Sequence, residues 1–114
     1  MGIEELLGQT LVSIEKYDDE LIFKLSNGTT YKMHHMQDCC ETVVIEDISG
    51  DLDDLLNTPI LIARESINTG SDEDNYGSCT WTYYHLATLK GYVDIRWYGS
   101  SNGYYSERVD FERI

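Results

Sequence analysis

Basic residues and long apolar runs are both scarce in this 114-residue chain. The chain has eight Lys and Arg residues and 21 Asp and Glu residues, so its formal net charge is −13. This charge argues against direct binding to DNA, RNA or anionic lipid, because these partners attract basic surfaces. The longest uninterrupted apolar run is Pro59–Ala63, far short of the roughly 20 residues that a transmembrane helix needs. We therefore expect neither nucleic-acid binding nor membrane insertion.

Cysteine is also scarce, and its placement is unusual. The chain has three cysteines, of which Cys39 and Cys40 are adjacent and Cys79 lies far away. Adjacent cysteines are poorly placed for an ordinary disulfide framework. The N-terminal residues 1–5 also lack the basic and apolar regions of a signal peptide. We therefore expect three reduced thiols in a cytoplasm.

Length and composition predict one folded domain over residues 1–114. A content of 41% hydrophobic and 11% aromatic residues is too high for a disordered acidic tail. Residues 1–74 carry the whole net charge, whereas residues 75–114 contain ten of the 13 aromatic residues. Tyrosine and tryptophan form strands well and are favoured at interfaces. The asymmetry therefore indicates an acidic region beside a tyrosine-rich sheet.

Alternation of apolar and polar residues predicts about seven short strands, with candidate segments at residues 10–17, 20–25, 29–34, 42–48, 60–65, 79–89, 91–99 and 104–112. Residues 2–7 and 51–56 suit short helical turns, and residues 68–78 are rich in loop-forming Gly, Ser, Asp and Asn. Closely spaced strands indicate a β-rich α+β fold. We expect a mostly antiparallel sheet, arranged as a small barrel or as a sheet with one or two short helices.

Two hairpins are predicted from the repeated tripeptide Ser-Asn-Gly, at residues 26–28 and 101–103. With a three-residue loop, Phe23 lies opposite Tyr31 in the first hairpin, and Ile95 lies opposite Val109 in the second. This register keeps apolar side chains together on one face, which is what fixes strand register in a half-buried sheet.

The second hairpin supplies the first candidate site. If Val93, Ile95 and Trp97 point into the core, the neighbouring residues point outward. The candidate ligand-binding or partner-binding residues are Tyr92, Arg96, Tyr98, Tyr104 and Arg108. Aromatic and guanidinium groups on one face suit a protein partner, and Arg96 could bind a phosphate group of a nucleotide. A solvated face with cross-strand ion pairs is the alternative.

An acidic series forms the second candidate site. It comprises Glu46, Asp47, Asp51, Asp53 and Asp54, with Asp72, Glu73 and Asp74 further along the chain. Closely spaced carboxylates could imitate the phosphates of DNA. Helix capping and solubility are the alternative explanation.

The segment 34–41 is the third candidate site. Its potential metal ligands are His34, His35, Asp38, Cys39 and Cys40, followed by Glu41. Imidazole, thiolate and carboxylate groups bind transition metals, but the spacing does not match that of a zinc finger. A turn with small buried cysteines and a redox-active disulfide between the adjacent cysteines are the alternatives.

The segments 31–41, 45–52, 81–84 and 95–106, with the motifs Gln-Asp-Cys-Cys-Glu (37–41) and Arg-Trp-Tyr-Gly (96–99), resemble a family of small tailed-bacteriophage and prophage proteins. The resemblance extends over nearly the whole chain. It implies a phage-encoded protein that acts in the cytoplasm of a bacterial host, and it supplies no catalytic residues.

The nucleophile elbow, the Walker loop, the dinucleotide-binding fingerprint and the His-Glu-x-x-His motif do not occur in the sequence. We therefore expect neither an enzyme nor a cofactor. The first hypothesis is a non-catalytic phage protein that binds and inhibits a host protein, in an anti-defence or host-takeover role. The second is a sponge that sequesters a nucleotide signal, for which a homo-oligomer would be favourable because such sites often form between subunits. The third is a metal-binding or redox protein that uses the segment 34–41.

Overall fold

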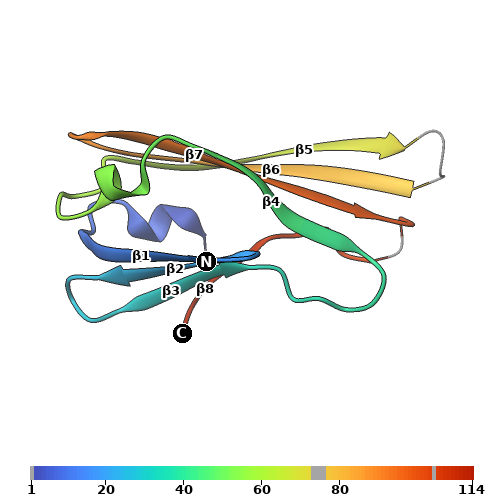
Figure 1. The fold of residues 1–114 in the computed structure, drawn as a ribbon, viewed down its shortest axis with the longest axis horizontal. Helices are drawn as coiled ribbons and strands as arrows, with labels where there is room; N and C mark the ends of the chain where they lie inside the picture. Colours follow the sequence, from blue (N-terminus) through green and yellow to red (C-terminus); the bar gives the residue numbers. More distant parts are fainter. Residues whose placement is uncertain (1, 73–76, 104) are drawn as a thin grey trace.

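Two four-stranded antiparallel sheets face each other in the computed structural model, which describes residues 2–72, 77–103 and 105–114 (Figure 1). The first sheet has the strand order β1-β2-β3-β8, and the second has the order β4-β7-β6-β5. The elements are the 3-10 turns η1 (Ile3–Leu6) and η2 (Leu52–Leu55) and the strands β1 (Leu11–Tyr17), β2 (Glu20–Leu25), β3 (Thr30–His34), β4 (Thr42–Ser49), β5 (Ile62–Asp72), β6 (Gly77–Thr88), β7 (Gly91–Ser101) and β8 (Asp110–Arg113).

The prediction of a β-rich, mostly antiparallel fold is confirmed, but the predicted alternative of a small barrel is wrong. Within the described residues the strands form two separate sheets, and both helical elements are single 3-10 turns. A closed barrel requires every strand to be paired on both edges. The edge strands β1, β8, β4 and β5 each have only one neighbour in their sheets, so the two sheets do not close into a barrel.

The first predicted hairpin is confirmed with its register. Phe23 lies opposite Tyr31, and the backbone N–H of Leu25 donates to the carbonyl oxygen of Thr29 at 2.8 Å. Gly28 has φ of +88°, a left-handed conformation that glycine adopts without strain. The three-residue loop therefore brings the apolar side chains of both strands to one face.

The second predicted hairpin is wrong. β7 is paired with β6 along one edge and with β4 along the other, so neither edge is free for the strand that follows. The chain crosses instead to the first sheet, where β8 pairs with β3 and Phe111 lies opposite Met33. Phe111 also stacks on Tyr31, with ring centroids 5.0 Å apart. This stacking helps to hold the returning chain in the other layer.

The predicted loop over residues 68–78 is also wrong where the structure describes it. β5 and β6 form a continuous ladder from Ile62 opposite Ala87 to Asp72 opposite Gly77. Of the predicted loop, residues 73–76 lie outside the described chain. Regular pairing with β6 supplies backbone hydrogen bonds that override the weak strand propensity of Asn68, Gly70 and Ser71. The long β5–β6 hairpin extends beyond the shorter strands of the first sheet (Figure 1).

The core lies between the two sheets. Trp97 and Tyr84 of the second sheet and Phe23 of the first are fully buried, and each contributes about 1.5–3 kcal/mol through burial of its apolar surface. Trp97 Nε1 donates to Met33 Sδ at 3.3 Å, which joins the layers by a polar contact. In the described part of the chain, no helix is long and apolar enough to cross a membrane.

A buried carboxylate fixes the segment that crosses from β7 to β8. Glu107 accepts hydrogen bonds from the hydroxyl groups of Ser78, Ser101 and Thr80. Burial opposes ionisation of Glu107, but these hydrogen bonds outweigh it and lower the pKa of the carboxyl group. The crossing segment also approaches β7 closely, because a Cβ at Gly99 would lie 2.9 Å from Glu107 Cβ.

Candidate functional site

The outer face of the second sheet gathers aromatic side chains from its two central strands. In β7, Val93, Ile95 and Trp97 are buried and the alternate residues are not, as the sequence predicts. In β6, the same alternation turns Thr82, Tyr84 and Leu86 inward. The remaining side chains form a surface that we call the aromatic face: Trp81, Tyr83, His85, Tyr92, Arg96 and Tyr98.

Ring contacts organise the aromatic face. Trp81 lies opposite Tyr98 in the ladder, with ring centroids 5.3 Å apart. His85 lies 5.6 Å from the ring of Tyr92, and its Nδ1 is 2.6 Å from Asp94 Oδ1. These contacts hold the rings in place, so the face needs little ordering when it binds a partner. Tyr92 remains 61% exposed, which leaves an apolar surface available.

Arg96 is surrounded by acidic groups on this face. Its Nε forms an ion pair with Glu46 Oε1 at 2.6 Å, and Asp47 lies opposite it in the ladder. A bulge between Ile45 and Asp47 allows two successive acidic residues of β4 to lie beside one arginine. The guanidinium charge is therefore partly neutralised, and this weakens the attraction of Arg96 for a phosphate group. The ion pair with Glu46 also fixes the orientation of the Arg96 side chain, which suits contact with a protein partner.

The structure does not bring all the predicted partner-binding residues together. Arg108 lies in the crossing segment and lines a groove on the inner side of the second sheet, whereas Arg96 lies on the outer side. Tyr104 lies outside the described residues. Trp81, Tyr83 and His85 are not among the predicted site residues, although the alternation of residues 79–89 places them on one face.

The acidic series lies beside the aromatic face, along β4 and η2. Glu46, Asp47 and Asp51 line a shallow hollow with Lys16. The side chain of Asp51 also caps η2, because its Oδ1 accepts a hydrogen bond from the backbone N–H of Asp53 at 2.9 Å. Asp53 and Asp54 occupy the first turn of η2. The series thus combines the capping role of Asp51 with further carboxylates on β4 and η2.

The cysteines of the segment 34–41 correct the prediction of reduced thiols. Cys39 and Cys40 form a disulfide bond, and Cys79 is free and buried. Two thiolates are thereby removed from the proposed set of metal ligands, and the described residues contain no group of three or more His, Cys, Asp or Glu side chains placed to hold a metal ion. Asp38 contributes its backbone N–H to Glu41.

Buried polar contacts organise the rest of this segment. His34 Nε2 lies 2.7 Å from Glu112 Oε1, and His35 Nδ1 donates to the carbonyl oxygen of Arg108 at 2.7 Å. Glu41 Oε1 accepts from the backbone N–H groups of Asp38 and Cys39. Burial opposes ionisation of Glu41, but the hydrogen bonds from Asp38 and His35 outweigh it and lower its pKa. The segment therefore acts as a structural connection between the sheets.

Comparison with known proteins places the chain in a family without indicating a chemistry. Neither a curated protein nor a solved structure matches the chain significantly. A family described as a domain of unknown function (DUF7448) matches residues 4–111. Because this match covers nearly the whole chain, the protein belongs to the DUF7448 family.

Proposed function

We propose that the protein is a non-catalytic binding protein that attaches to another protein through the aromatic face and thereby inhibits it. The observation that carries the proposal is the partly exposed set of aromatic side chains in mutual ring contact around Arg96, on the outer side of the second sheet. Trp, Tyr and Arg are the residue types that dominate the binding energy of protein interfaces.

The acidic surface beside the aromatic face supports a partner with a basic rim. Glu46 and Asp47 lie directly next to Arg96, and Asp51, Asp53 and Asp54 extend the negative surface along η2. A basic surface of this kind is typical of proteins that bind nucleic acid. Acidic side chains on the rim would steer such a partner and speed its association.

The resemblance to phage proteins makes a protein of the bacterial host the proposed target, in an anti-defence or host-takeover role. Host cytoplasm is then the place of action. A nucleotide sponge has less support, because Arg96 is ion-paired with Glu46 and Arg108 lies on the other side of the sheet.

Affinity capture tests the proposal. The immobilised protein should enrich one host protein from bacterial lysate above a charge-matched acidic control protein. Tyr92→Ala should abolish the enrichment, because this side chain is 61% exposed on the aromatic face. Tyr17→Ala is the matched control, since Tyr17 is a tyrosine of the first sheet that is 52% exposed. The proposal would be refuted if Tyr92→Ala and Tyr17→Ala lost equal enrichment of the host protein, or if the unaltered protein enriched none.

A further inference from the structure

The four edge strands of the two sheets differ in how well they are protected against pairing with another chain. β1 has a register shift between Leu11 and Ser13, and β4 has one between Ile45 and Asp47. The backbone N–H of Ile45 is also occupied, because it donates to Asp19 Oδ1 at 3.3 Å. β8 is only four residues long. Bulges, short length and covering contacts are the features by which proteins keep edge strands from pairing with other chains.

β5 has none of these features in the part that the structure describes. It is eleven residues long and contains no proline, and it pairs with β6 without a register shift. Residues 64–70 are all exposed, and their backbone groups are hydrogen-bonded to no described segment other than β6. Alternate N–H and C=O groups of an edge strand point away from its neighbour. β5 therefore presents a long, regular row of unpaired backbone groups.

The distribution of charge favours a second copy of this chain as the occupant of that edge. The whole chain has a net charge of −13, yet β6 contains no Asp, Glu, Lys or Arg. In β5 the charges of Arg64 and Glu65 cancel, and residues 66–71 carry none. A strand with a basic surface would find little attraction at this edge. Two copies of an otherwise strongly acidic chain, in contrast, repel each other least where they meet along β5.

Antiparallel pairing of two copies of β5 is also self-complementary. The strand runs from Ile62 to Asp72, so full overlap places its midpoint, Ile67, opposite the same residue of the second copy. Arg64 then lies opposite Gly70, and Glu65 lies opposite Thr69. No two like charges face each other in this register, and like charges directly opposite would be destabilising.

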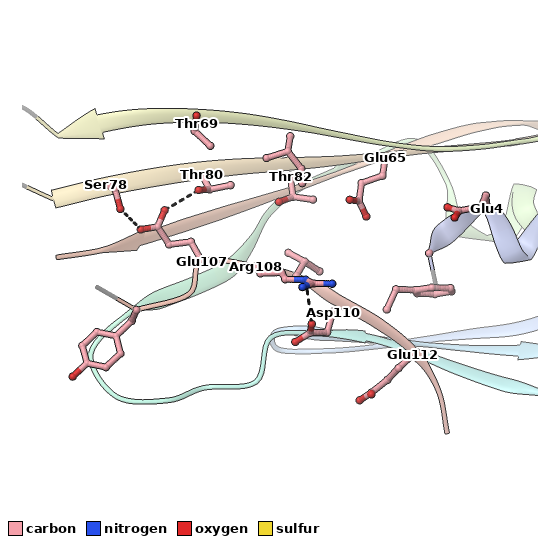
Figure 2. A pocket seen from close by; sticks show the side chains of 15 residues that line it. Glu4, Glu65, Thr69, Ser78, Thr80, Thr82, Glu107, Arg108, Asp110 and Glu112 are labelled. Carbon is pink, nitrogen blue, oxygen red and sulfur yellow. Dashed lines mark hydrogen bonds and ion pairs between the residues drawn. The ribbon is translucent and has the colours of Figure 1, made fainter. Parts of the chain in front are cut away.

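The midpoint of β5 carries an apolar side chain that this chain leaves uncovered. Ile67 is 58% exposed. It lies between Glu65 and Thr69 in the alternation of the strand, and Figure 2 shows both of these side chains on the groove side of β5. Directly opposite residues of an antiparallel pair point to the same side, with Cβ atoms about 4.5–5.5 Å apart. Pairing about Ile67 therefore covers each exposed isoleucine with the other.

We propose that two copies of this chain pair along β5, antiparallel and about a two-fold axis at Ile67, so that their four-stranded second sheets become one continuous sheet. Such an interface uses the same surface of both copies, as is usual for homodimers. The axis is perpendicular to the sheet, so the aromatic faces of both copies lie on the same side of it. The contact uses the edge of the sheet and not the aromatic face, so either proposal can fail without the other.

Sedimentation velocity over a range of protein concentrations tests the pairing. The unaltered protein should change from monomer to dimer as its concentration rises. Ile67→Lys should raise the dissociation constant about tenfold or more, because it places two positive charges opposite each other at the axis and removes the apolar contact. The matched control is Leu89→Lys, which adds the same charge at a side chain that is 84% exposed in the turn between β6 and β7. This control should leave the dissociation constant nearly unchanged.

A cysteine cross-link locates the axis and stays informative if the lysine variant fails to fold. Ile67→Cys should give a disulfide-linked homodimer under mild oxidation, because the two Cβ atoms at the axis lie near the separation that a disulfide bond spans. Leu89→Cys should give none, and the unaltered protein shows the background from its own three cysteines.

Three results would overturn the proposal. The first is a monomer at every concentration, which would leave the edge of β5 to a strand of a different protein. The second is an equal effect of Ile67→Lys and Leu89→Lys on the dissociation constant. The third is a cross-linked dimer from position 89 and none from position 67, which would place the contact at the opposite end of the β6–β7 turn from the strand edge.

Discussion

Replacing Glu107 with alanine should lower the free energy of unfolding by about 3 kcal/mol. The carboxylate accepts three hydroxyl groups, from Ser78, Ser101 and Thr80, and a hydrogen bond to an ionised group contributes about 1.5–3 kcal/mol. The three contributions do not add fully, because the hydroxyl groups of Ser78 and Ser101 are 3.4 Å apart and can bind each other in the variant. The expected loss therefore lies nearer to one strong contribution than to three.

Urea denaturation followed by tryptophan fluorescence measures this loss. The matched control is Asp53→Ala, which also removes one negative charge from a chain of net charge −13 but at an exposed site. For a domain of this size, a loss of about 3 kcal/mol lowers the melting temperature by roughly 10–15 °C. A free energy of unfolding of Glu107→Ala within about 0.5 kcal/mol of that of the control variant would refute the idea that this carboxylate fixes the crossing segment.

The pH dependence of stability gives a second readout of the same carboxylate. The pKa of Glu107 is lower in the folded protein than in the unfolded chain, where it is about 4.3. The stabilisation is therefore complete above that unfolded value and is lost as the pH falls through the folded pKa. Glu107→Gln should flatten the acid limb of the stability profile, and an unchanged limb would contradict the assignment.

Three further results are expected. Trp97→Ala should lower the free energy of unfolding by about 3–5 kcal/mol, because the side chain is fully buried and donates to Met33 Sδ. A urea midpoint near that of the unaltered protein would contradict the place of Trp97 in the core. Gly99→Ala should destabilise by about 1–3 kcal/mol, since its Cβ would lie 2.9 Å from Glu107 Cβ, and calorimetry would detect the lower melting temperature. Arg96→Ala should change the free energy of unfolding by less than about 1 kcal/mol, because the ion pair between Arg96 and Glu46 is about half exposed. The same variant should weaken capture of the partner, and a variant that unfolds would mean that Arg96 has a structural role.

Local patterns in the sequence predict the strands well and their assembly poorly. Alternation in residues 91–99 correctly divides the inward Val93, Ile95 and Trp97 from their outward neighbours. The turn at residues 26–28 also gives the correct register, because Gly28 adopts the left-handed conformation that the loop requires. The same tripeptide at residues 101–103 is followed by a crossing to the other sheet. Its composition carries no information on whether the edges of β7 are already occupied.

The candidate site shows the same division between local and long-range information. Tyr92, Arg96 and Tyr98 share one face because they alternate in a single strand. Trp81 and Tyr83 join them only through the pairing of β6 with β7, which is a long-range property. Arg108 was assigned to that face through a hairpin that does not form. The groove that Arg108 lines lies between the β5–β6 ladder and the segment that precedes β8, and no short motif specifies that arrangement.

Photo-cross-linking from the aromatic face tests the central claim most directly. A photoreactive amino acid replaces Tyr92 in one variant and Tyr17 in the other, and both variants are expressed in bacterial cells and irradiated. The account predicts a discrete cross-linked product containing a second protein from position 92 and none from position 17. Cross-linking from position 17 alone, or the same products from both positions, would contradict the assignment of the aromatic face as the binding surface.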